Sequence, residues 1–136
     1  METPSTSVSI QISGAGIIWL KLAILYLLLG IGMGIAMGAT ETFTLRPVHA
    51  HINLLGWVSM GLIGIIYTLF ARAAASPLAR VHFWMHNLSL PIMMAALAML
   101  LQGNRAVIPV IAASEIVMLL GTLVFAFNVF KNVKSD

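Results

Sequence analysis

Two histidines, His49 and His51, lie one residue apart at the start of a long apolar stretch, and their spacing limits the chemistry they can share. On a helix, residues two apart point about 200° away from each other, so the two imidazoles cannot both bind one ion from a regular helix. Each is expected to serve a different neighbouring space. The face of His49 continues through Asn53, Gly56 and Met60. We expect Gly56 to leave room there for a flat, bulky group.

Neutral imidazole is a ligand for both haem iron and copper. The alternative is a pair of interfacial histidines that bond to water or lipid headgroups. Unpaired burial of an ionisable group in a membrane is costly, which favours a ligand role for His49 and His51. The sequence has no cysteine. It therefore has no thiolate metal site, c-type haem attachment or cysteine-ligated iron–sulfur cluster.

The composition indicates how these histidines are surrounded. Of the 136 residues, 60% are hydrophobic and 8% are charged, against roughly 25% charged in a soluble domain. The seven cations are scattered at the ends of apolar segments, which suits lipid headgroups better than nucleic acid. The sequence predicts an all-α integral membrane protein, with residues 1–136 forming a single domain in the lipid bilayer.

Four apolar runs are each near the length that a transmembrane helix needs, roughly 17–39, 48–70, 83–101 and 107–130. Five cations fall at the termini or in the 72–80 linker: Lys21, Arg72, Arg80, Lys131 and Lys134. Arg46 and Arg105 fall on the other side, where Glu41 offsets them. The positive-inside rule then places both termini in the cytoplasm and the histidine pair near the outer face.

The first span carries glycines at four-residue spacing, Gly30, Gly34 and Gly38. Such a stripe lets another helix approach closely, so we expect a tightly packed bundle. Lys21 beside Trp19 is expected to be an interfacial anchor, with its ammonium group extended toward water.

Two further sets of polar residues fall within the spans. Glu115 lies about eight residues into the fourth run; it is either a proton-relay or histidine-partner group, or a neutral packing residue beside Ser114. His82 and His86 are four residues apart and share one helix face, as metal ligands do. Because no third ligand accompanies them, we favour interfacial hydrogen bonding over a second metal site.

The sequence motifs and their order along the chain resemble those of subunit I of haem–copper oxidases and nitric oxide reductases. The stretch His49-Ala-His51 and the helix after it resemble helix X of that family, where the first histidine ligates the high-spin haem and the second ligates the low-spin haem. The stretch His82-Phe83-Trp84 resembles the opening of helix XI, and residues 121–132 resemble the end of helix XII. The resemblance covers about 120 residues in colinear order, from helix IX to helix XII.

That family has twelve spans, and the helices that would carry its copper ligands and linked tyrosine have no counterpart here. The resemblance therefore implies haem b bound by His49 and His51, with Arg105 or Arg46 near the haem propionates. Since the family's helices form three arcs of four, three copies of this chain would form a homotrimer of twelve helices. His51 of one chain and His49 of its neighbour would then ligate one iron.

The expected function is electron transfer by a bis-histidine haem in a bacterial inner membrane, with a redox partner that the sequence does not name. An open axial site would instead allow reduction or sensing of oxygen or nitric oxide, so the sequence leaves open whether the protein is an enzyme. Copper binding without haem and a non-redox assembly role are the remaining alternatives.

Overall fold

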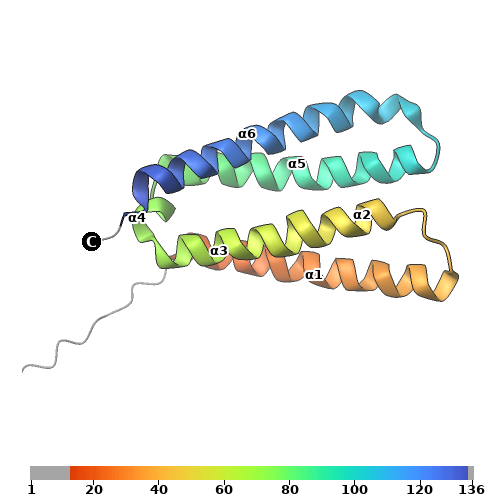
Figure 1. The fold of residues 1–136 in the computed structure, drawn as a ribbon, viewed down its shortest axis with the longest axis horizontal. Coiled ribbons are helices and arrows are strands. Elements are labelled where there is room, and N and C mark those ends of the chain that lie inside the picture. The colour runs from red at the N-terminus through yellow and green to blue at the C-terminus, as the bar shows by residue number, and fades with distance from the viewer. Residues whose placement is uncertain (1–12, 135–136) are drawn as a thin grey trace, which may run out of the picture.

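All regular secondary structure that the computed structural model describes, over residues 13–134, is helical (Figure 1). Four helical segments are long and apolar enough to cross a membrane: Gly14–Thr40, Arg46–Leu69, Pro77–Leu101 and Arg105–Asn132. The predictions of an all-α chain and of four potential spans are therefore confirmed for the described residues, and they support a multi-pass membrane protein.

The first segment is α1 (Gly14–Thr40), and the second consists of α2 (Arg46–His51), the π-helix η1 (Ile52–Ser59) and α3 (Met60–Leu69). The rest of the chain forms the single turn α4 (Ala71–Ala74), the long α5 (Pro77–Leu101), the 3₁₀ turn η2 (Arg105–Val107) and α6 (Ile108–Asn132). Helix α1 begins and α6 ends at one end of the bundle, here called the terminal end (Figure 1). The connections α1–α2 and α5–η2 lie at the opposite end, here called the loop end.

The third long helix begins at Pro77, earlier than the predicted start near residue 83. Ser76 is extended, and its hydroxyl oxygen accepts a hydrogen bond of 3.2 Å from the Leu78 amide. A serine N-cap followed by proline in the first turn is a strong start signal for a helix. This start moves Arg80 from the predicted linker into the first turn of α5.

Directly after His51 the chain forms a π-helix of eight residues, η1. Its hydrogen bonds span five residues instead of four, and the Ser59 hydroxyl donates to the Leu54 carbonyl at the same separation, over 2.9 Å. Such segments are rare and are often found at functional sites. No pattern in the sequence predicted this one, next to the histidine pair.

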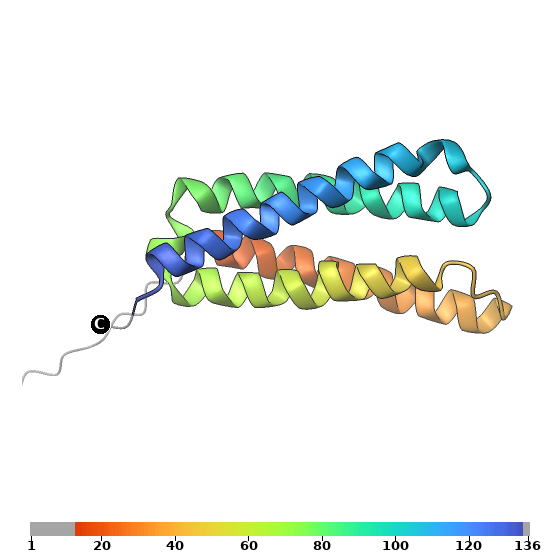
Figure 2. The ribbon, with the colours of Figure 1, turned by 45° about the horizontal axis from the view of Figure 1, so that its top comes forward.

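The bundle consists of two antiparallel hairpins, α1 with the α2–η1–α3 segment and α5 with α6 (Figures 1 and 2). Within the first hairpin, glycines allow close approach: a Cβ on Gly16 would lie 2.7 Å from the carbonyl oxygen of Gly64. The predicted stripe is confirmed at Gly30 and Gly34, which face η1 and α2, whereas Gly38 has open space around it. Close helix contact therefore rests on part of the predicted stripe and on Gly16.

The two hairpins meet at the terminal end through a set of stacked rings, here called the ring cluster: Trp19, Tyr67, His82, Phe83, His86 and Phe125. The Trp19 ring stacks on His82 with centroids 4.9 Å apart, and Phe125 lies 4.9 Å from His82 on another side. Trp19, which was expected beside the anchor Lys21 at the membrane interface, is only 1% exposed. It is a core residue that joins α1 to α5, whereas Lys21 is exposed.

Candidate functional site

His51 is exposed at the end of α2 and has the hydrogen bond that a metal-ligating histidine needs. Its Nδ1 lies 2.8 Å from the Pro47 carbonyl oxygen, four residues earlier. Because a carbonyl can only accept, Nδ1 carries the proton and Nε2 keeps its lone pair. Within residues 13–134, Nε2 has no hydrogen-bond partner. A backbone carbonyl that fixes the tautomer in this way is the usual support for an imidazole that binds metal through Nε2.

His49 has different surroundings. It is half-buried, and its Cε1 lies 3.2 Å from the position of a Cβ on Gly34, so the ring lies against α1. Its Nδ1 lies 3.4 Å from the side-chain nitrogen of Asn53, which also donates to the His49 carbonyl over 2.9 Å. Since an amide NH₂ can only donate, Nδ1 accepts and the proton is on Nε2. Ligation by Nε2 of His49 therefore requires this contact with Asn53 to change.

Gly56 does lie on the face that includes His49 and Asn53, as predicted, but the space beside it is filled. A Cβ on Gly56 would lie 2.5 Å from Cγ of Tyr26 in α1. The flat group that fills this space in one chain is the Tyr26 ring, which corrects the expectation that Gly56 leaves room for a cofactor. Gly56 serves packing between α1 and η1.

Arg46 and Arg105 are both exposed, and each is the first residue of an element that follows a connection at the loop end. Arg46 begins α2, and its guanidinium carbon lies 5.2 Å from the centre of the Phe43 ring. Arg105 begins η2, at the start of the fourth span. Neither forms an ion pair within the part of the chain that the structure describes, so both guanidinium groups are available to an anionic group at this end.

Glu115 is exposed on α6, seven residues after the helix begins at Ile108. Its neighbour Ser114 is buried and donates to the Val110 carbonyl over 2.8 Å, without involving the carboxyl group. Within one chain, therefore, Ser114 does not engage the Glu115 carboxyl group, and both interpretations of Glu115 stay predictions. A carboxyl group exposed at membrane depth is costly unless it is protonated or meets a partner from outside the chain.

His82 and His86 are buried, 1% and 3% exposed, so the prediction of interfacial hydrogen bonding is wrong. His86 Nε2 donates to the Leu55 carbonyl oxygen of η1 over 3.3 Å, and His82 Nδ1 lies 3.2 Å from the Tyr67 hydroxyl. The two imidazole centroids are 5.8 Å apart. In residues 13–134 no third histidine, aspartate or glutamate joins them to form a metal-binding group. The arrangement favours a structural role.

A buried chain of hydrogen bonds continues from Tyr67 to α6, and sequence reasoning missed it. Asn132 donates to the Asn128 side-chain oxygen over 2.7 Å, and Asn128 donates to the Tyr67 hydroxyl over 3.3 Å and to the Ala73 carbonyl over 2.9 Å. Because that hydroxyl accepts from Asn128, its own proton remains free to be donated to His82 Nδ1. The only signal in the sequence was two asparagines, four residues apart, in an apolar helix end.

A cavity of about 340 Å³ lies beside this network, between the α2–η1–α3 segment, α5 and α6. His82 and His86 line one side, and apolar side chains such as Ile63 and Met118 line most of the rest. The cavity lies between the two hairpins, and His82, His86 and Phe125 of the ring cluster are among its lining residues.

Comparisons of the chain with protein-family models, curated proteins and solved structures give no significant match. The likeness to haem–copper oxidases therefore stays a prediction, and the functional argument depends on the geometry of the residues themselves.

Proposed function

We propose that this chain is a b-type haem protein of the bacterial inner membrane that transfers electrons. Three copies would form a ring of twelve helices with haem between neighbouring chains. His51, through Nε2, and His49 of the neighbouring chain would together hold the haem iron. Arg46 and Arg105, exposed at the same end of the bundle, would bind the propionates.

The observation that carries this proposal is the hydrogen bond from His51 Nδ1 to the Pro47 carbonyl. It holds an exposed imidazole with its Nε2 lone pair free, within a segment apolar enough to cross a membrane. An exposed imidazole that faces lipid with one ring nitrogen lacking a hydrogen bond would be costly, so a ligand or a second chain at this position is favoured. The donor set fits haem, since neutral imidazole is a common axial ligand of haem iron.

The different surroundings of the two histidines are the reason to propose a ring of three chains. His51 is exposed, whereas His49 lies against α1 of its own chain. Two ligands on different sides of one helix can complete a site only with a second copy, and repetition of that contact closes a ring when the rotation allows it. Glu115, exposed in α6, is the group we expect to meet a polar partner in the neighbouring chain.

Bound haem supplies a reversible one-electron couple. The protein supplies the axial ligands, keeps water away and sets the potential through burial and hydrogen bonding. The five cations assigned to the terminal end support a cytoplasmic position for that end by the positive-inside rule, and a position of His51 near the outer face.

A second candidate function is gas chemistry or gas sensing at a haem with one open axial position. The contact of Asn53 with His49 favours it, because this contact leaves the proton on Nε2 of His49 and so blocks ligation. Reduced protein whose alpha and beta absorption bands are unmoved by carbon monoxide would identify six-coordinate electron transfer. A shift with carbon monoxide would identify the open site.

The test of the proposal is the haem content of His51→Ala, purified from haem-replete cells. We expect it to lose its haem while its helical circular dichroism is unchanged. Leu54→Ala is the matched control, since Leu54 is also exposed one turn away on the same segment and should keep its haem. Full haem content in His51→Ala would refute the ligand assignment, and a haem-loaded monomer in analytical ultracentrifugation would refute the trimer.

A further inference from the structure

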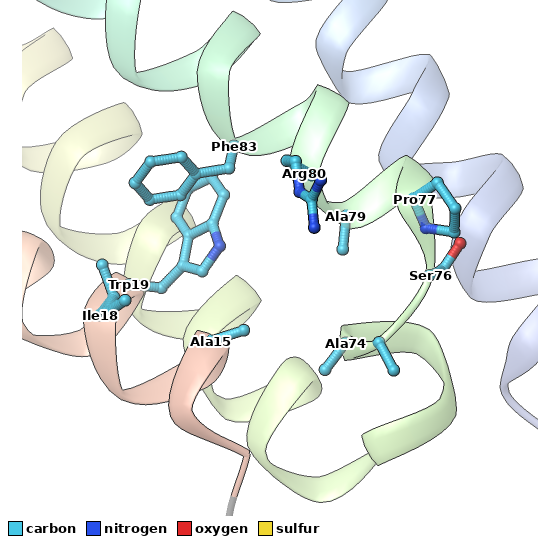
Figure 3. A pocket seen from close by; sticks show the side chains of 10 residues that line it. Ala15, Ile18, Trp19, Ala74, Ser76, Pro77, Ala79, Arg80 and Phe83 are labelled. Carbon is cyan, nitrogen blue, oxygen red and sulfur yellow. The ribbon is translucent and has the colours of Figure 1, made fainter.

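A cavity of about 380 Å³ opens at the terminal end, where the first turns of α1 and α5 lie beside α4 (Figure 3). Its walls are mostly small or apolar side chains, such as Ala15 and Ala79. Two nitrogen-bearing side chains, Trp19 and Arg80, also line it. Figure 3 shows the indole nitrogen of Trp19 on the edge of the ring that is turned toward Arg80.

Trp19 is an unpartnered donor at this cavity. The residue is 1% exposed, and its indole N–H forms no hydrogen bond within residues 13–134. An indole N–H can only donate. No buried side-chain nitrogen or oxygen of the described residues lacks a hydrogen-bond partner, so this N–H is open to the cavity and not enclosed by protein. The rest of the ring is held by its stack on His82, so the N–H cannot easily turn to another partner. An acceptor placed in the cavity would satisfy it.

Arg80 makes the cavity positive. It is exposed in the first turn of α5, where the helix dipole adds further positive potential. The two acidic residues of the described part of the chain lie elsewhere, Glu41 at the loop end and Glu115 on α6. Within residues 13–134 the two donors have no carboxylate beside them, and they select an anion with several acceptor oxygens, such as a phosphate group.

A second cavity, of about 400 Å³, lies farther along the same seam between α1 and α5. Leu25 and Leu29 of α1 and Met94 of α5 are among its apolar lining residues. Leu25 follows Ile18, which lines the first cavity, by seven residues or about 10 Å along the helix. A positive cavity at the helix ends is thus followed, toward the middle of the span, by an apolar one.

We propose that this seam binds one anionic phospholipid. Its phosphate accepts from the Trp19 N–H and the Arg80 guanidinium, and one acyl chain lies against Leu25 and Leu29. Basic pockets between transmembrane helices are known to bind anionic headgroups in this way. The apolar second cavity favours a lipid over free phosphate, which would use only the first. The proposal is independent of the haem site, which lies at the other end of the bundle.

The test uses Trp19 as the reporter. A Trp57→Phe, Trp84→Phe background leaves Trp19 as the only tryptophan. This protein, in phosphatidylcholine nanodiscs, is titrated with phosphatidylglycerol that carries brominated acyl chains, which quench tryptophan emission on contact. We expect quenching that saturates at a low mole fraction of phosphatidylglycerol, and weaker quenching by brominated phosphatidylcholine at equal mole fraction.

Arg80→Gln should weaken the binding of phosphatidylglycerol roughly 5-fold, the effect of one cation near a headgroup. Arg72→Gln is the matched control, because Arg72 is exposed at the same end but does not line the cavity. Native mass spectrometry of the otherwise wild-type chain gives a second measurement, in which Arg80→Gln should retain less phosphatidylglycerol than Arg72→Gln.

Three results would overturn the proposal. The first is equal quenching by the two brominated lipids, and the second is equal retention by Arg80→Gln and Arg72→Gln. The third is displacement of brominated phosphatidylglycerol from Trp19 by millimolar inorganic phosphate alone, which would identify a site for free anions.

Discussion

Replacing Tyr67 by phenylalanine removes one oxygen atom from the buried contact between the two hairpins and leaves the ring in place. That hydroxyl lies 3.2 Å from His82 Nδ1 and accepts from Asn128 over 3.3 Å. Asn128 keeps its bond to the Ala73 carbonyl, whereas His82 Nδ1 loses its hydrogen-bond partner within residues 13–134 and is left buried and unpaired. The substitution therefore tests whether His82 is held as a structural residue.

The expected cost follows from these two contacts. Side-chain hydrogen bonds within membrane proteins average about 0.6 kcal/mol each in double-mutant cycles, so the pair is worth about 1 kcal/mol. A buried polar atom left without a partner adds roughly 1–3 kcal/mol where water cannot reach it. Because a cavity lined by His82 lies nearby and can admit water, we take the lower part of that range. The expected loss for Tyr67→Phe is about 2 kcal/mol in the free energy of unfolding.

The assay is reversible unfolding in mixed micelles with increasing sodium dodecyl sulfate, followed by circular dichroism. Tyr26→Phe is the matched control, because Tyr26 is half-buried and its hydroxyl forms no hydrogen bond within residues 13–134. We expect it to change the free energy of unfolding by less than about 0.5 kcal/mol. Equal effects of the two substitutions would refute the structural role of the Tyr67–His82 bond.

Three further substitutions, one of them with a matched control, test the packing and the helix ends by the same unfolding assay. Gly16→Ala places a methyl group 2.7 Å from the Gly64 carbonyl oxygen and should lower the free energy of unfolding by about 1–3 kcal/mol. In the control Gly32→Ala the methyl group meets no atom within 4 Å, so the free energy of unfolding should be unchanged or slightly higher. Equal effects of the two substitutions would contradict the close approach of the helices at Gly16. Ser76→Ala removes the cap of α5 and should cost about 1 kcal/mol; an unchanged stability would show that the cap is dispensable. Gly103→Ala, at φ 98°, should cost about 1 kcal/mol because a side chain is strained there; a neutral result would place the turn in another conformation.

The number and class of the elements could be predicted because hydrophobic length is a local property. A run of about 20 apolar residues identifies a span whatever its neighbours are. The start of α5 could also have been predicted, since Ser76 followed by Pro77 is a local start signal that the hydropathy boundary near residue 83 obscured. The π-helix η1 left no such signal, because the ordinary apolar residues within it fit an α-helix equally well.

At the candidate site, the sequence predicted only the features that depend on spacing along one helix, and not the contacts between helices. The spacing of His49 and His51 predicted that the two rings serve different spaces, and their surroundings differ in the structure. The filling of the space beside Gly56 by Tyr26 could not be predicted, because it depends on how α1 lies against η1. In each such case the partner comes from a distant part of the chain.

Burial of the polar residues was the hardest feature to anticipate. Trp19 and His82 have the composition of interfacial residues, yet they stack on one another in the core because α1 and α5 meet at that point. Asn128 bonds to Tyr67 across 61 positions of sequence. In such pairs, the position of one residue on its helix does not predict which distant residue it contacts.

If His51 ligates haem b at the contact between chains, the purified protein contains haem b, which its pyridine haemochrome spectrum measures. A ring of three chains has three equivalent contacts, so we expect about one haem b for each chain. A colourless protein from haem-replete cells would contradict it.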